Sequence, residues 1–210
     1  FFYITMMNEL LCKINIDTCS VLTKRKFPSV DLIITSPPYV TSYEYADLHQ
    51  LSSLWLDYTD DYTCLRKGTM GSAYNCETFI YNMDDLNNTA KEIITSLQNN
   101  KEIAKSKIKP IARYYIDMQK AAMQCYKMLK SPGLALFIIG DTEYKGTKIH
   151  NSKQLVESLM QSGFSEVMIS KRRISNKILT PYRDINGKFT SDKTKREIYH
   201  EEFVVIGRKS

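Results

Sequence analysis

The sequence has 210 residues, 43% hydrophobic and 25% charged, which predicts a soluble globular chain with a core sufficient for one domain and excludes a disordered or fibrous protein. No apolar run approaches the roughly 20 residues of a membrane span, which excludes a helical membrane protein. The formal charge is +6, and all of it lies in residues 171–210, which hold 11 Lys and Arg and 5 Asp and Glu.

The first residues and the cysteines indicate a cytoplasmic protein. Phe1–Met7 lacks a basic leader and a small-residue cleavage site, so we predict no signal peptide. The sequence begins with Phe rather than Met, which indicates a fragment or an unusual gene start. The five cysteines are scattered without a Cys-x-x-Cys pair and the three histidines are isolated, so we predict reduced, buried thiols and no metal site.

Two strands are predicted near the start of the chain. Cys12–Asp17 alternates apolar and polar residues and predicts a short strand that ends in an acid, followed by a brief helix over residues 18–22. Asp17 is a candidate cap for that helix. The apolar, β-branched run from Val30 to Thr35 predicts a second strand, buried in a sheet.

A rigid polar loop, Ser36-Pro37-Pro38-Tyr39, follows the second strand. Two prolines end the strand because neither donates a backbone hydrogen bond. In open α/β sheets, ligands bind at the carboxyl ends of the strands. The loop suits a planar base with an exocyclic amino group, since Ser36 and a proline carbonyl can accept its two hydrogens while Tyr39 stacks on the ring. A polyproline ligand or a simple turn is the alternative interpretation.

The next stretch is predicted to be partly helical. Apolar residues at helical spacing predict an amphipathic helix over residues 44–57, with Trp55 in the core. Tyr43 and Tyr45 either line a base pocket or pack inside the protein. Residues 58–110 are predicted to form an insertion with its own helix that stands off the sheet and has a lysine-rich end. This insertion either contacts DNA or is a solvated face.

Helices and strands alternate in the second half of the chain. The pattern predicts helices over residues 111–129 and 152–161, and strands over residues 134–139, 164–170 and 202–208. Asn186-Gly187 is typical of a hairpin turn, so residues 171–200 are predicted to form a basic hairpin region. Such a region indicates a polyanionic partner, and an ordinary solvated hairpin is the alternative.

Thr35-Ser36-Pro37-Pro38-Tyr39 resembles the catalytic motif of the amino-group DNA methyltransferases. Its serine resembles the cytosine-N4 branch, since the adenine-N6 branch usually carries Asp or Asn there. The later order of helix, Lys-x-Pro-Gly, apolar strand, Gly-Asp and a last strand ending in Gly-Arg-Lys is similar to the same family. The resemblance runs from about Asn15 to Lys209, and only the catalytic loop is highly specific.

The resemblance implies an α/β fold with a class I, Rossmann-like sheet in a single catalytic domain over residues 1–210. It implies methyl transfer from S-adenosyl-L-methionine to N4 of a flipped-out cytosine in double-stranded DNA, as in a restriction-modification system. Ser36, Pro37, Pro38 and Tyr39 are then catalytic, and Asp17 either contacts the cofactor or only caps a helix. The basic residues expected to contact DNA are Lys171, Arg172, Arg173, Lys193, Lys195 and Arg196.

The glycine-rich cofactor turn of this family is not found in the sequence. Its common form is Phe-x-Gly-x-Gly, whereas no two of the 8 glycines here are separated by a single residue. We therefore expect an incomplete class I sheet and a second polypeptide that carries the cofactor-binding half. A truncated sequence, a split enzyme and a decayed gene are the competing explanations.

Two other functions are compatible with the sequence. A non-catalytic DNA-binding or specificity subunit would keep this fold without turnover. An adenine-N6, RNA or protein-glutamine methyltransferase would also use a Pro-Pro-Tyr loop, although Ser36 argues against these substrates.

Overall fold

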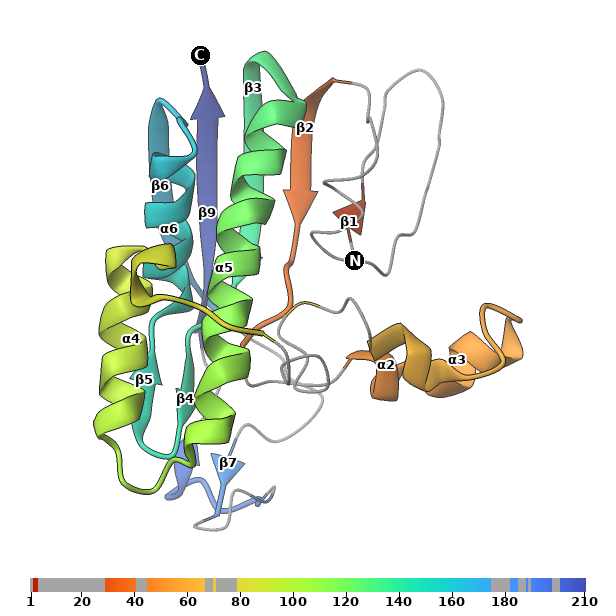
Figure 1. Ribbon diagram of the computed structural model, residues 1–210, viewed down its shortest axis with the longest axis vertical. Coiled ribbons are helices and arrows are strands. Elements are labelled where there is room, and N and C mark those ends of the chain that lie inside the picture. The colour runs from red at the N-terminus through yellow and green to blue at the C-terminus, as the bar shows by residue number, and fades with distance from the viewer. Residues whose placement is uncertain are drawn as a thin grey trace.

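A five-stranded mixed sheet organises the computed structural model, which describes residues 2–3, 29–40, 45–66, 70, 79–174, 182–184, 188, 190–197 and 201–210 (Figure 1). In spatial order its strands are β1 (Phe2–Tyr3), β2 (Val30–Thr35), β3 (Leu129–Ile139), β9 (Glu201–Lys209) and β6 (Glu166–Arg173). β2 and β3 are parallel, and β9 is antiparallel to both β3 and β6. The carboxyl ends of β2, β3 and β6 therefore lie at one edge of a mixed α/β fold.

Helices α4 (Asn88–Asn99), α5 (Lys105–Met128) and α6 (Asn151–Gln161) cover one face of this sheet (Figure 1). α5 packs on the sheet through one side, because its apolar side chains recur every three or four residues along that side. Tyr114, Tyr115 and Met118 from that side are buried with Phe137 of β3 and Val205 of β9. Each large side chain buried in this way stabilises the fold by about 1.5–3 kcal/mol.

Smaller elements surround this body. A tight hairpin joins β4 (Thr142–Tyr144) to β5 (Thr147–Ile149). Lys145 and Gly146 at its turn both have positive φ, at 46° and 77°. The remaining elements are α2 (Tyr45–Leu48), α3 (Gln50–Trp55), the 3-10 helices η1 (Tyr62–Arg66) and η3 (Met83–Asp85), β7 (Tyr182–Arg183) and β8 (Arg196–Glu197).

Most predicted helices and strands are confirmed, with shifted boundaries. The helix predicted over residues 111–129 is α5, which begins earlier, at Lys105. It passes directly into β3, so Ser131-Pro132-Gly133 lies within the strand instead of before it. The helix predicted within residues 58–110 is α4, and it packs on α5 and α6 rather than standing off the body. The predicted Cys12–Asp17 strand and the Asn186-Gly187 turn lie outside the described residues.

Two predictions of burial are wrong. β2 was expected to be buried on both faces, but the side chains of Leu32 and Ile34 are 41% and 48% exposed. Trp55 was expected in the core, but it is 87% exposed. The helices α4, α5 and α6 cover one face of the sheet, so Leu32 and Ile34 on the other face stay exposed. The helices α2 and α3 pack chiefly on each other and on η1, which leaves Trp55 exposed.

The described cysteines differ in environment. Cys125 is buried, and burial raises the pKa of its thiol to about 12, whereas Cys64 is exposed, so the prediction of buried thiols is wrong for Cys64. The described residues contain no group of three or more His, Cys, Asp or Glu side chains that could hold a metal ion. None of the helices in the described part of the chain is long and apolar enough to span a membrane.

Candidate active site

The loop Ser36–Tyr39 lies beside the end of β3. β2 and β3 are parallel and in register, with Thr35 opposite Phe137, so the loop after β2 is adjacent to the end of its neighbour. The Ser36 hydroxyl is on the exposed side of this edge, and its Oγ donates a hydrogen bond to the Ile138 carbonyl at 3.2 Å.

This hydrogen bond decides which role the Ser36 hydroxyl can play. A serine hydroxyl has one proton to donate and two lone pairs with which to accept. Because the proton is directed at Ile138, the lone pairs of Ser36 Oγ remain for a ligand. Ser36 is therefore arranged as a hydrogen-bond acceptor at the sheet edge.

The proline carbonyls are not equivalent. The Tyr114 hydroxyl donates to the Pro38 carbonyl at 2.8 Å, across 76 positions of the sequence. No described residue donates to the carbonyl of Pro37. Pro37 is buried and Pro38 is half-buried, so the loop is only partly exposed. Of the two carbonyls, that of Pro37 is the one without a donor among the described residues.

Tyr39 packs against a glycine at the end of β3. A Cβ atom placed on Gly140 would lie 2.9 Å from Cε2 of the Tyr39 ring, closer than carbon atoms approach in proteins. The ring is half-buried, so part of it remains accessible. Gly140 thus allows the Tyr39 ring to lie close to the backbone of β3, next to the Ser36 acceptor.

We expect Gly140→Ala to displace Tyr39. If the loop is catalytic, as its resemblance to the methyltransferase motif implies, this change should lower methyl transfer about tenfold or more, since misplacement of about 1 Å in an active site is costly. Steady-state kinetics measures the effect. Gly146→Ala is the matched control, because a Cβ there meets nothing within 4 Å although its φ of +77° strains the turn. An equal loss of activity in both variants would show that the Tyr39 position is not the cause.

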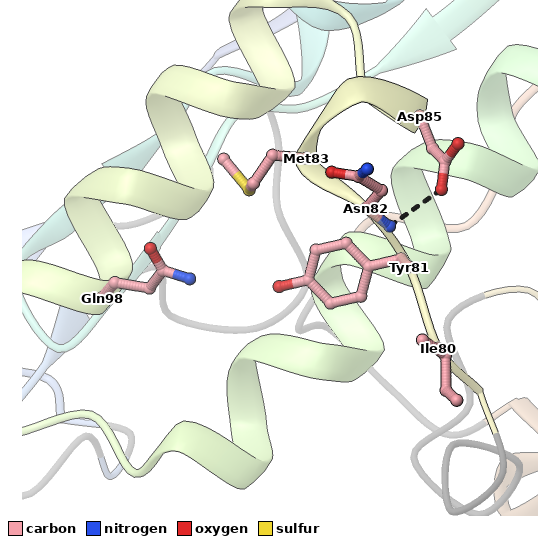
Figure 2. A pocket seen from close by; sticks show the side chains of 6 residues that line it. All are labelled: Ile80, Tyr81, Asn82, Met83, Asp85 and Gln98. Carbon is pink, nitrogen blue, oxygen red and sulfur yellow. Dashed lines mark hydrogen bonds between the residues drawn. The ribbon is translucent and has the colours of Figure 1, made fainter.

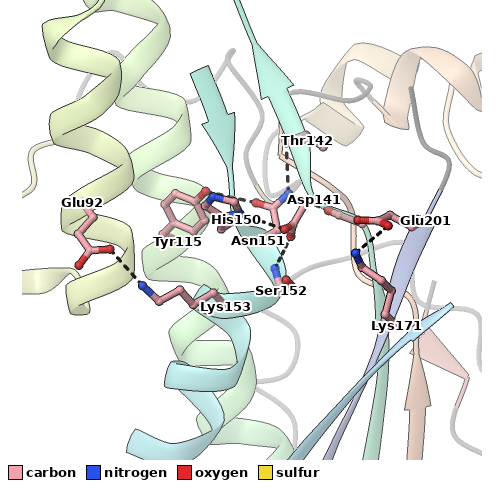
Figure 3. A network of polar contacts seen from close by, with 11 residues as sticks. Glu92, Tyr115, Asp141, Thr142, His150, Asn151, Ser152, Lys153, Lys171 and Glu201 are labelled. Carbon is pink, nitrogen blue, oxygen red and sulfur yellow. Dashed lines mark hydrogen bonds and ion pairs between the residues drawn. The ribbon is translucent and has the colours of Figure 1, made fainter. Parts of the chain in front are cut away.

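A buried polar network supports this corner of the sheet (Figure 3). Asn151 donates from Nδ2 to the Gly140 carbonyl at 3.0 Å, and its Oδ1 accepts from the Tyr115 hydroxyl at 3.2 Å. Burial raises the pKa of Tyr115 well above its ordinary value, so this hydroxyl keeps its proton at neutral pH. Thr142 donates from Oγ1 to the Val40 carbonyl at 3.4 Å. Asn151 thus binds the backbone at the end of β3, and Thr142 binds the backbone just after the Ser36–Tyr39 loop.

Asp141 connects the same corner to α6. Its Oδ1 accepts from the backbone N–H of Ser152 at 2.9 Å, in the first turn of the helix. Its Oδ2 lies 3.2 Å from Nδ1 of His150 (Figure 3). A carboxylate at a helix N-terminus stabilises the helix, and this contact fixes α6 relative to the end of β3.

The basic residues predicted to bind DNA lie on this side of the sheet. Lys171, Arg172 and Arg173 end β6, whose carboxyl end shares the edge of β2 and β3. Lys171 forms an ion pair with Glu201 at 2.8 Å (Figure 3). Arg172 forms an ion pair with Glu202. Because successive strand residues point to opposite faces, Arg172 faces away from the other two.

The second basic group belongs to the β7–β8 region. Lys193 and Lys195 are exposed, and Lys195 lies 3.9 Å from Asp192. β7 lies beyond the carboxyl ends of β2 and β3 in Figure 1. The side chain of Arg196 and the whole of Asp17 lie outside the described residues.

The described residues fit a base better than they fit S-adenosylmethionine. A cofactor cradle needs glycines that let the backbone approach the ligand closely. Of the described glycines, Gly140 is the one at the end of β3, and its open side is filled by Tyr39. Asp17, the predicted cofactor residue, is not among the described residues.

A shallow surface pocket lies between the segment before α4 and α4 itself, away from this corner (Figure 2). Tyr81 and Gln98 are on its opposite sides, and the capping hydrogen bond from Asn82 N to Asp85 lies at its rim. It is widely open and brings together no ionisable cluster. We assign it no function.

Three contributors to the candidate site were not predicted from the sequence. Tyr114 and Asn151 are each at least nine-tenths buried, and Gly140 was assigned only to a family block. Tyr114 lies in the helix predicted over residues 111–129, for which the sequence indicated no role beyond helix formation. The signal that could have found it is chemical, because a buried tyrosine hydroxyl requires a hydrogen-bond partner.

No protein-family model and no curated protein matches the chain. Among solved structures, it is similar to a presumed DNA modification methylase from Thermus thermophilus, with 12% sequence identity and a TM-score of 0.38. The alignment covers 92% of this chain and 50% of that one, so the chain spans about half the length of the protein it matches. At this level of similarity, only the residues of the chain itself can support a function.

Proposed function

We propose that the chain is the base-binding, catalytic part of a DNA methyltransferase that modifies N4 of a flipped-out cytosine, and that a segment outside these 210 residues, on the same or another polypeptide, binds S-adenosylmethionine. The observation that carries this proposal is the orientation of Ser36, whose proton is directed at Ile138 while its lone pairs remain for a ligand. An exocyclic amino group has two hydrogens to donate. Ser36 Oγ and the Pro37 carbonyl supply two adjacent acceptors for them.

Two acceptors would make the amino nitrogen a better nucleophile. Its lone pair is delocalised into the pyrimidine ring, which keeps the nitrogen flat and unreactive. Hydrogen bonds from both N–H groups to Ser36 and Pro37 favour a more tetrahedral nitrogen with a localised lone pair. Tyr39, supported by Gly140, stacks on the ring and keeps its plane fixed during the reaction.

The target base has to leave the helix to reach this loop. Flipping costs about a few kcal/mol, and contacts to the DNA backbone offset it. The basic end of β6 lies at the same sheet edge as Ser36 and Tyr39, which supports an approach of DNA from this side.

Product analysis tests the proposed reaction. DNA is incubated with the complete enzyme and S-adenosylmethionine and then digested to nucleosides for mass spectrometry. We expect N4-methylcytosine. Detection of N6-methyladenine would indicate an adenine-N6 methyltransferase instead. DNA binding without any methylated base would favour a non-catalytic DNA-binding subunit.

The basic residues predict a salt-dependent interaction with DNA. Neutralising Lys171, Arg172 and Arg173 together, or Lys193, Lys195 and Arg196 together, should weaken binding and lower the salt slope by about one unit per lost phosphate contact. Fluorescence anisotropy over a series of salt concentrations measures both quantities.

A matched control exists on the helical layer. Lys91, Lys120 and Lys153 lie on α4, α5 and α6, where they face Asp or Glu side chains, and their neutralisation removes the same charge. We expect the control to keep the wild-type slope. Overlapping titrations for all the variants would show that the basic end is ordinary solvated surface.

A further inference from the structure

The segment α2–α3 presents a set of large apolar side chains to solvent. It projects beyond the carboxyl end of β2, to one side of the sheet and its helices (Figure 1). Its Ala46 and Ser53 are buried, whereas its larger side chains are not. The Trp55 surface consists of Leu48, Leu51, Leu54, Trp55, Leu56 and Tyr58, which are 41% to 87% exposed.

The Trp55 surface has the features of a docking helix. On α3, Leu54 and Trp55 lie three and four residues after Leu51, the spacing by which helices dock into apolar grooves. Tryptophan and tyrosine are the side chains that most often dominate the energy of protein interfaces. An exposed group of this kind on a folded protein indicates an interaction site.

A second open apolar surface lies on the sheet. Along β3, Ala135 and Phe137 are buried under the helices, whereas Leu134 and Leu136 alternate with them on the other face and are only partly buried. Strand pairing places side chains of β2, β9 and β6 in line with these two. The open sheet face consists of Leu32, Ile34, Leu134, Leu136, Ile138, Met168, Val204 and Ile206.

Parallel strands are normally covered on both faces. On the open sheet face, Leu32, Ile34 and Met168 are 41%, 48% and 43% exposed, and the helices α4, α5 and α6 pack on the opposite face. The aliphatic part of this face extends over four strands, beside the ion pairs Glu166–Arg208 and Arg172–Glu202. It is therefore suited to receive an apolar helix.

Charge indicates what occupies the Trp55 surface. Residues 45–66 contain four acidic side chains, Asp47, Asp57, Asp60 and Asp61, and one basic side chain, Arg66. The rest of the chain has 28 basic and 19 acidic residues, a balance of +9. A segment of charge −3 disfavours nucleic acid and favours a basic protein with an apolar surface. A second copy of this chain is such a protein.

We propose that the Trp55 surface of one copy packs on the open sheet face of a second copy, and that the exchange is reciprocal, giving a closed two-fold dimer. Reciprocal exchange covers both apolar surfaces of both copies and leaves no end for further growth. It also brings the acidic segment of each copy against the basic body of the other. The proposal does not rest on the proposed function.

The single tryptophan makes the interface directly observable. Trp55 is the only tryptophan in the chain, so its emission reports whether the Trp55 surface is in water or buried. Light scattering and tryptophan emission are measured on the full chain from about 1 to 100 μM, a range that detects micromolar affinity. We expect the mass to double and the emission to shift to the blue over the same concentrations.

Variants on the two surfaces test their pairing. Leu51→Ser on the Trp55 surface and Leu32→Ser on the open sheet face should each raise the dimer dissociation constant about tenfold or more. In Leu32→Ser, Trp55 itself is unchanged. Its emission maximum should nevertheless remain at the longer wavelength of a solvent-exposed tryptophan at concentrations where the wild-type emission is blue-shifted. Ile80→Ser is the matched control, because Ile80 is 90% exposed outside both surfaces and should leave dimerisation unchanged.

Three results would overturn the proposal. The first is a monomer throughout the range. The second is a blue-shifted emission in the monomer, which would mean that the Trp55 surface folds back within its own chain. The third is an association that resists both Leu51→Ser and Leu32→Ser while circular dichroism shows both variants folded. Leu51 is 78% exposed, so its removal should not affect folding, and circular dichroism verifies the fold of Leu32→Ser, whose side chain is 41% exposed.

Discussion

Replacing Ser36 or Tyr39 by alanine is expected to lower methyl transfer by the complete enzyme about 10²–10³-fold. Ser36→Ala removes the acceptor whose proton is directed at Ile138, so one amino hydrogen of the base loses its partner. Tyr39→Ala removes the ring that packs on Gly140 and is proposed to hold the base plane. Single-turnover methylation assays, in which the enzyme exceeds the DNA, separate this loss from slow product release.

Two residues at the opposite end of the sheet provide matched controls. Ser165 is also exposed and also donates to a backbone carbonyl, that of Arg208, at 3.0 Å. Tyr126 also packs on a glycine, since a Cβ on Gly163 would lie 3.2 Å from its ring. Ser165→Ala and Tyr126→Ala should therefore keep the wild-type rate once stability is matched. Wild-type turnover by Tyr39→Ala would contradict the role in base stacking.

The isolated chain is expected not to bind S-adenosylmethionine at micromolar concentrations and not to methylate DNA. Its sequence has no Gly-x-Gly turn, and the described glycine at the end of β3 is occupied by the Tyr39 ring. Asp17 alone would supply at most one contact. Titration calorimetry with the cofactor tests this expectation.

The complementary experiment adds a second polypeptide that carries the glycine-rich half of the family. Cofactor binding and methylation should then appear together. Micromolar binding by the isolated chain, or methylation of cytosine by its 210 residues alone, would show that a second polypeptide is not needed.

Local patterns in the sequence predicted the helices and strands of the body. The Val30–Thr35 run and the repeat of buried residues in α5 required only hydrophobic periodicity. The strand has the expected bounds, and the helix includes the expected residues but begins earlier, at Lys105. Periodicity shows which side of an element is apolar but not whether another element covers that side. Leu32, Ile34 and Trp55 were placed in the core for this reason, although they are exposed.

The loop chemistry was predictable and its geometry was not. The residue types in Ser36–Tyr39 indicated an amino-base site because such a base needs acceptors and a stacking ring. The acceptor orientation of Ser36 depends on a carbonyl 102 residues away, and the Pro38 carbonyl accepts a hydrogen bond from a tyrosine of α5, 76 residues away. Contacts across such separations follow from sheet pairing and helix packing, which no local pattern contains.

The most direct measurement of the central claim compares two DNA duplexes that differ only in the target amino group. One carries cytosine at the methylated position and the other carries 2-pyrimidinone, which lacks the amino group. The dissociation constant of each duplex is measured with wild-type and with Ser36→Ala enzyme. The analogue flips more easily with both proteins, so this effect cancels when the preference for cytosine is compared between wild type and Ser36→Ala.

If Ser36 accepts an amino hydrogen, wild type should favour cytosine over the analogue by about tenfold more than Ser36→Ala does, because a buried polar site discriminates against a ligand that leaves it unpaired. The same ratio in both proteins would contradict recognition of the amino group by the Ser36–Tyr39 loop.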